Sequence, residues 1–218
     1  MNDAIVSING SGMQTLEILT LMTLITLLPS ILIMMTSFTR IVIVLSLLRN
    51  AMGLQQTPPN TVLIGIALFL SLFIMQPVIN DINQNAYQPY KADLITQEQA
   101  LDNASVPIKE FMLKQTKVDS LNVYLNFAHM KRPQNLMEIP MHVVIPAFIT
   151  SELSRAFLMG FLLYIPFLVI DIIVSSVLMS MGMVMLPPSM ISMPFKLLLF
   201  VVVNGWELLF STLVSSFN

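Results

Sequence analysis

The sequence predicts an all-helical protein of the integral-membrane type. Of its 218 residues, 56% are hydrophobic and only 10% are charged, whereas about a quarter of a soluble domain is charged. The charges are also unevenly spread. They leave uncharged stretches long enough to cross a bilayer as helices, and they gather in the middle of the chain. We therefore expect one domain, residues 1–218, built from helical hairpins.

Residues 1–80 are expected to hold two apolar helical segments. Twenty-two uncharged residues separate Glu17 from Arg40, enough for about 33 Å of helix at roughly 1.5 Å per residue. The second segment follows Pro58-Pro59, a pair typical of a helix start, and is densest at 61–75. The first dozen residues lack the positive start of a cleavable signal peptide, so we interpret the N-terminus as mature.

Residues 81–138 form a polar, water-facing region with seven acidic and six basic residues. A helix is expected here from Pro107 to about Phe127. Its apolar side is predicted to consist of four residues at helical spacing: Ile108, Phe111, Met112 and Gln115. The positive-inside rule would place this region in the cytoplasm, but a loop of this length is at the limit of that rule, so charge alone leaves the orientation open.

Residues 139–218 are expected to hold two more apolar segments joined by a methionine-rich loop. Only one charge, Asp171, falls between Ala156 and Phe195. Pro187-Pro188 divides this stretch, since proline interrupts helices. We expect one helix to end near Met185 and another to run from about Met193 to Phe217.

Five ionisable residues lie in apolar surroundings: Arg40, Glu152, Asp171, Lys196 and Glu207. Each is costly in hydrocarbon and needs a partner, a cavity or an interface. We expect Arg40 and Glu207 to reach water from the ends of their segments. Glu152 could pair with Arg155, three residues away, or with a distant partner. Asp171 and Lys196 have no local partner, which favours a contact between helices or a functional role.

Methionine is unusually frequent, and six of the 18 methionines fall within 15 positions: Met179, Met181, Met183, Met185, Met190 and Met193. Alternate residues face opposite sides of a helix, so this spacing favours a loop. Flexible apolar side chains in a ring could seal a channel against ions and yield to a large cargo. The alternative is that these methionines only fill an irregular core.

Several functional classes are excluded. The net charge of −2 offers no basic surface for nucleic acid. The chain has no cysteine, a single intramembrane aspartate instead of a catalytic pair, no zinc-protease motif and no phosphate-binding glycine loop. We expect no catalytic residue, metal or cofactor. An ion or proton transporter that titrates Glu152 and Asp171 stays open, and an intramembrane enzyme ranks third.

Three long strings of the sequence, at residues 37–79, 145–161 and 167–206, and a short one at 86–90 resemble the FliP/SctR family of type III secretion export-gate proteins. They include SFTRIVIVLSLLRNAMGLQQTPPN, IPAFITSELSRAFLMGF and PFKLLLFVVVNGW. The resemblance extends from about residue 16 over nearly the whole chain. Ordered strings of this length are far more specific than a short motif.

This resemblance implies a non-enzymatic, pore-forming subunit of the flagellar protein export gate. Several copies are expected to assemble with FliQ and FliR, next to FlhA and FlhB, and to pass unfolded flagellar proteins. The gate would lie in the bacterial inner membrane at the flagellar basal body, with residues 81–138 on the periplasmic side. Its helices would pack mainly on neighbouring subunits.

The resemblance also implies site residues. The methionine-rich gasket of the family falls on Met183, Val184 and Met185. The charge pair between subunits falls on Glu152 and Lys196, which favours a distant partner for Glu152 over Arg155. Arg40 and Asp171 stay as intramembrane charges without an assigned role.

Overall fold

The computed structural model describes residues 5–8, 11–131, 133–183 and 185–217. Two short antiparallel strands, β1 (Ile5–Ile8) and β2 (Ser11–Gln14), form a hairpin at the N-terminal end. The remaining elements of the described chain are helices, so the predicted helical fold class is confirmed.

The first expected span is interrupted. Helix α1 (Thr15–Met34) ends before α2 (Phe38–Ala51) begins, so the expectation of one helix between Glu17 and Arg40 is wrong. The hydroxyl of Thr36 donates to the carbonyl of Ile33. The hydroxyl of Ser37 donates to the hydroxyl of Ser71. The two hydroxyl groups thus bind a carbonyl of α1 and a side chain of the helix that follows α2, which stabilises the turn between α1 and α2.

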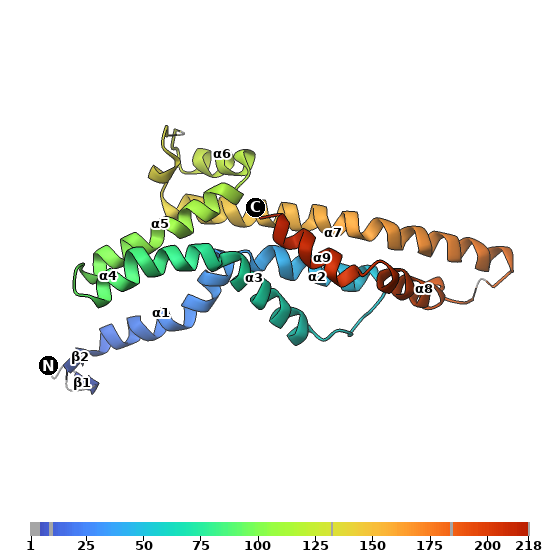
Figure 1. The fold of residues 1–218 in the computed structure, drawn as a ribbon, viewed down its shortest axis with the longest axis horizontal. Helices are drawn as coiled ribbons and strands as arrows, with labels where there is room; N and C mark the ends of the chain where they lie inside the picture. Colours follow the sequence, from blue (N-terminus) through green and yellow to red (C-terminus); the bar gives the residue numbers. More distant parts are fainter. Residues whose placement is uncertain (1–4, 9–10, 132, 184, 218) are drawn as a thin grey trace.

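The second expected segment is confirmed. Helix α3 (Asn60–Ile82) begins directly after Pro59 and continues through a π-helical turn (Asn83–Tyr87) into α4 (Gln88–Lys91). Pro77 lies inside α3. It lacks an N–H group and its ring crowds the preceding turn, and Figure 1 shows a bend in this helix.

The polar region contains α5 (Gln97–Gln115), α6 (Val118–Phe127) and a 3₁₀ turn (Leu136–Glu138). The expected helix from Pro107 to Phe127 has the wrong bounds. Helix α5 starts ten residues earlier because Thr96 and Gln99 form a capping box. The helix is interrupted at Thr116–Lys117, and α6 begins after these two residues. The predicted apolar side is confirmed, since Met112 and Gln115 are buried.

The third segment is the 40-residue helix α7 (Met141–Ser180), close to the prediction. The prediction that the fourth segment is a single helix is wrong. Helix α8 (Pro188–Val202) and helix α9 (Gly205–Ser215) meet at a bend of 65°. Asn204 lies between them in the left-handed conformation, with φ of 50°, which ends α8.

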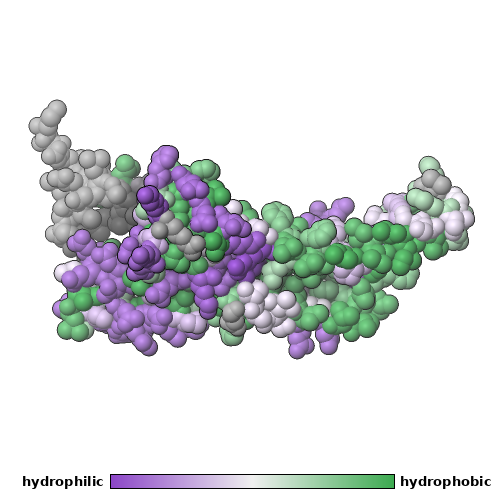
Figure 2. Space-filling model, turned by 90° about the horizontal axis from the view of Figure 1, so that it is seen from above, coloured by the Kyte–Doolittle hydropathy of each residue, from purple (hydrophilic) through white to green (hydrophobic). Residues whose placement is uncertain are grey.

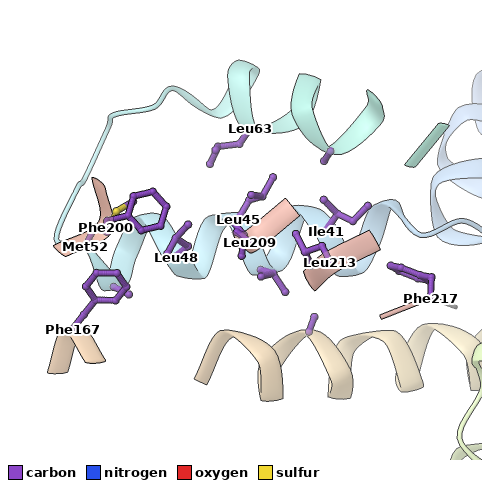
Figure 3. Close-up of a cluster of buried hydrophobic side chains, with 14 residues drawn as sticks. Ile41, Leu45, Leu48, Met52, Leu63, Phe167, Phe200, Leu209, Leu213 and Phe217 are labelled. Atoms are coloured by element: carbon purple, nitrogen blue, oxygen red, sulfur yellow. The ribbon is translucent and has the colours of Figure 1, made fainter. Parts of the chain in front are cut away.

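Helix α2 lies at the centre of the larger apolar core. Figure 1 shows α2 alongside the long helix α7, and Figure 3 shows α3 on the opposite side of α2 from α7. Buried side chains of α2 and of the apolar helices around it contribute to this core: Ile41, Leu45, Leu48, Met52, Leu63, Phe167, Phe200, Leu209, Leu213 and Phe217.

A smaller core joins the polar region to the first half of α7. Its buried members come from α5, α6 and α7 and from other segments packed against them: Met35, Met112, Leu121, Leu125, Ile139, Val143, Val144, Ala147 and Phe148. Helix α7 therefore belongs to both cores. Its first turns anchor the polar helices, and its later turns lie among the apolar ones.

The two ends of the molecule differ in polarity. Figure 2 shows hydrophilic residues over one end and hydrophobic residues over the other. Among the described residues, two helical runs are long and apolar enough to cross a membrane, 60–91 and 141–180, and the bent pair α8–α9 could form a third span. Most of the apolar surface of these runs is exposed in the single chain.

A close contact between α2 and α7 at Gly160 provides a test of the packing. A Cβ atom on Gly160 would lie 3.0 Å from the Cβ atom of Leu47 and closer still to its Cδ1. We expect Gly160→Ala to lower the free energy of unfolding by roughly 1–3 kcal/mol, because overpacking displaces α2. Thermal unfolding in detergent, followed by circular dichroism, measures this change.

The matched control is Gly65→Ala in α3, where no atom lies within 4 Å of the new Cβ. That substitution should stabilise the helix by about 0.5–1 kcal/mol. Equal effects at the two glycines would contradict the close approach.

Candidate functional site

The methionine-rich loop joins α7 to α8 at the far end of the molecule (Figure 1). Helix α7 ends in a Schellman motif: the N–H of Met183 donates to the carbonyl of Leu178 at 2.9 Å, and the N–H of Gly182 donates to that of Met179 at 3.0 Å. Gly182 has φ of 73°, a conformation that costs glycine nothing. The end of α7 thus fixes the direction in which the loop leaves the helix.

The side chains of the loop face outward. Met183 is 42% exposed and Met185 is 95% exposed, the latter among the most exposed large apolar side chains of the described chain. The prediction that the methionines occupy a loop holds for these two residues but is wrong for Met179, which lies in α7, and for Met190 and Met193, which lie in α8. Val184, predicted with the gasket, lies outside the described residues. The two thioethers therefore lie at the tip of the helical hairpin formed by α7 and α8.

The first buried ion pair joins α2 to α7. The guanidinium of Arg40 donates to both carboxylate oxygens of Glu152, with Nε 2.9 Å from Oε2 and Nη2 in contact with Oε1. The two side chains are 1% and 0% exposed. The expectation that Arg40 reaches water is therefore wrong: its polar partner lies inside the protein, 112 residues along the chain.

The remaining donors of Arg40 bind two other parts of the chain. Its Nη1 donates to the carbonyl and hydroxyl oxygens of Ser216, at 2.9 and 2.8 Å, and Nη2 donates to the Gln115 side chain at 3.1 Å. The guanidinium carbon also lies 3.6 Å from the ring centroid of Phe217. All five N–H donors thus have an acceptor, which is what offsets the desolvation of a buried charge.

Gln115 extends this network. Its amide nitrogen donates to the carbonyl of Phe217 at 2.8 Å, and its oxygen accepts from Arg155 at 2.9 Å. Arg155 therefore binds Gln115 through a hydrogen bond, and the local Glu152–Arg155 alternative is not the ion pair that forms. The network connects α2, α5, α7 and the two residues after α9.

The second ion pair joins α7 to α8. Lys196 Nζ lies 2.7 Å from Oδ2 of Asp171, and the hydroxyl of Ser192 donates to Oδ1 at 2.5 Å. Lys196 also donates to the carbonyl of Ala51, at the end of α2, at 3.0 Å. The contact between helices that the sequence favoured for Asp171 is confirmed. We call Asp171, Ser192 and Lys196 the hairpin cluster.

Glu152 and Lys196 are both buried, but they do not meet within the chain, since each has the partner described above. A single chain thus already supplies a partner for each of these two ionic groups. A contact between Glu152 of one subunit and Lys196 of the next concerns an assembly, so it stays a prediction. Glu207, by contrast, is exposed in the first turn of α9, where a negative charge is favourable.

Sequence reasoning missed Gln115 and Ser216 as hydrogen-bond partners of Arg40. It also missed Ser192 as a hydrogen-bond donor to Asp171. Ser192 and Lys196 are four residues apart, which places them on one face of a helix, so their spacing was a usable signal. No local pattern marks Ser216 as a partner of a residue 176 positions away.

A shallow apolar groove of about 570 Å³ lies next to the helical hairpin formed by α7 and α8. It is lined by α2, α7, α8 and α9, with Leu48, Leu163 and Leu209 among the lining residues, and its surface is almost entirely apolar. Exposed side chains continue this surface along the outer side of α7: Phe157, Leu158, Phe161, Leu162, Leu168, Val169, Ile172 and Ile173.

Within the described residues, no group of three or more His, Cys, Asp or Glu side chains is placed to hold a metal ion. The buried ionisable side chains of the apolar helices are used in ion pairs and hydrogen bonds. What the arrangement offers chemically is an apolar surface, a flexible methionine tip and charge pairs that fix helices.

A model of the FliP family matches residues 21–213 of the chain. The chain belongs to the FliP family. It is 51% identical over 211 residues to the flagellar biosynthetic protein FliP of Pectobacterium carotovorum, a match that covers 96% of this chain and 82% of the relative. The Bacillus subtilis FliP is 52% identical over 204 residues, 94% of this chain and 92% of the relative.

The FliP of Buchnera aphidicola from Acyrthosiphon pisum is 50% identical over 211 residues, which make up 95% of this chain and 56% of that longer relative. The resemblance seen in the sequence is confirmed by these matches. The FliP family is not an enzyme family, so the prediction that the chain is not an enzyme is confirmed as well.

The buried pair predicts a specific stability pattern. Arg40→Leu leaves Glu152 buried without its cation, so we expect a loss of roughly 3–5 kcal/mol in the free energy of unfolding. Arg40→Leu with Glu152→Leu should recover a large part of that loss, because no uncompensated charge is left. Thermal unfolding of the detergent-extracted protein measures both.

Arg49→Leu is the matched control, since Arg49 lies in the same helix and makes hydrogen bonds but no ion pair within the described chain. We expect it to cost only about 1 kcal/mol. A double variant no more stable than Arg40→Leu would contradict the pairing.

Proposed function

We propose that this FliP-family chain is a pore-forming subunit of the flagellar type III protein export gate. Several copies surround a central path together with FliQ and FliR, adjacent to FlhA and FlhB, and unfolded flagellar proteins pass through. The family membership supports a role in flagellar biosynthesis, and the sequence resemblance supports the place in the gate. The complex lies in the inner membrane at the basal body, with residues 81–138 on the periplasmic side.

The observation that carries the proposal is the position of Met183 and Met185. They stand exposed at the tip of a hairpin, at the apolar end of the molecule. Copies arranged around an axis would bring these tips together, and their thioether side chains would exclude water and ions from the path. Unbranched methionine side chains can then change rotamer around a passing polypeptide.

The exposed face of α7 and the groove beside α9 support assembly of several copies. A large apolar surface on a single chain marks contact with lipid or protein. The charges give less support to the transporter alternative, because Glu152 and Asp171 are both engaged in ion pairs within the chain.

The seal can be tested by shortening its side chains. In cells with the other gate components, Met183→Ala with Met185→Ala should increase the uptake of small ions and dyes, because the tips no longer fill the axis. Assembly should persist, since neither side chain belongs to the buried cores. Dye uptake and the size of the extracted complex are the measurements.

Met22→Ala with Met34→Ala removes two exposed methionines from α1 instead, and permeability should then stay at the level of the parent chain. Unchanged permeability in the Met183 and Met185 variant would rule out the seal.

The pair between Glu152 and Lys196 of neighbouring subunits calls for neutral substitutions. Reversing both charges would place a lysine next to Arg40 and a glutamate next to Asp171, so the outcome would be confounded. We expect a double-mutant cycle of Glu152→Gln and Lys196→Met to show a coupling above about 0.5 kcal/mol in the assembled complex. The isolated subunit should show none, and equal coupling in both forms would argue against contact between subunits.

A further inference from the structure

One carboxylate carries the polar attachment of α8 to α7 in the described chain. Asp171 accepts from the hydroxyl of Ser192 through one oxygen and from Lys196 through the other. The two donors are one turn apart on the same face of α8. Because both oxygens are used, Asp171 fixes the rotation of α8 as well as its position along α7.

The hairpin cluster is more accessible to water than the Arg40–Glu152 pair. The side chain of Asp171 is 37% exposed, whereas those of Arg40 and Glu152 are 1% and 0% exposed. Water can solvate an accessible carboxylate once its partners leave, which lowers the cost of separating the pair. The Arg40 network is therefore the costlier of the two attachments to separate, and the hairpin cluster is the less costly one.

Lys196 would stay in place after such a separation. Its side chain is only 4% exposed, and its ammonium also donates to the carbonyl of Ala51 at the end of α2, where a cation is favourable. Separation at Asp171 would thus free the outer turns of α7 from α8, while α8 stays attached to α2.

A surface groove of about 470 Å³ runs along the two helices from the hairpin cluster toward the loop, with Val177, Leu178 and Phe195 among its lining residues. Within the described residues of these turns, no hydrogen bond or ion pair joins the two helices beyond Asp171. Asp171 is accordingly the last polar attachment before Met183 and Met185.

We propose that Asp171 is a positioning residue for the methionine seal. When paired with Ser192 and Lys196, it holds the ends of α7 and α8 together and keeps Met183 and Met185 at the axis. When the pair separates, the ends of the helices move apart and the seal loosens. This inference rests on the proposed function of the loop.

The absence of cysteine from the chain allows a direct measurement. Spin labels on Ser176→Cys in α7 and Ser189→Cys at the start of α8, in complexes assembled with an excess of unlabelled subunit, report the distance between the two helices. Asp171→Asn should broaden and lengthen this distance and raise ion leakage severalfold. Asp171→Glu, which keeps the carboxylate, should restore much of both.

Glu207→Gln is the control, because Glu207 is an exposed carboxylate of α9 outside the cluster. It should change neither the distance nor the leakage. Asp171→Asn could lower the protein level by leaving Lys196 unpaired, so leakage is expressed per amount of extracted complex. The leakage per complex and the distance distribution should still change, which a lower protein level alone would not produce.

The outcomes separate this inference from the proposed function. An unchanged distance in Asp171→Asn overturns the positioning role. Leakage in the Met183 and Met185 variant, together with a tight seal in Asp171→Asn, also overturns it and leaves the gate intact. A broad distance without leakage in either variant supports the positioning of the hairpin by Asp171 and overturns the seal.

Discussion

The guanidinium of Arg40 joins four segments that are far apart in the sequence. Its five donors bind Glu152 of α7, Gln115 of α5 and Ser216 beyond α9, while Arg40 itself belongs to α2. A buried ion pair is weak evidence for stability, because desolvation offsets the attraction. The directions of the hydrogen bonds made by Arg40 constrain the arrangement of the helices more strongly than the energy of the ion pair does. Leucine, isoleucine and methionine surfaces tolerate many packings, whereas five directed hydrogen bonds allow one arrangement of the helices.

This constraint relates the polar half of the molecule to the apolar half. Phe111 of α5 stacks on Phe217 with ring centroids 6.3 Å apart and packs edge-on against Phe148 of α7. The water-facing helices and the apolar helices therefore share one buried junction. Beyond it, α7 carries the methionine loop away from the fixed part of the protein, with the hairpin cluster as a second and more accessible attachment.

Much of this fold could be predicted from charge-free stretches and proline pairs. One helix begins at Asn60, directly after the first pair, as predicted, whereas α8 begins at Pro188, five residues before the predicted start near Met193. The break before α2 could not be predicted, because hydropathy does not register the hydroxyl bond between Ser37 and Ser71. The sequence showed that Arg40 and Asp171 needed partners, but the partners depend on tertiary packing. The methionine spacing predicted a loop, while the role of that loop came only from the family resemblance.

The close contact between Gly160 and Leu47 is a fixed point about which the outer part of helix α7 would tilt. Twenty residues of α7 extend past it to Ser180, about 30 Å at roughly 1.5 Å per residue. Over that length, a tilt of about five degrees displaces the far end by roughly 2.5 Å. A slight repacking deep in the protein would therefore become a larger displacement of the loop that carries Met183 and Met185.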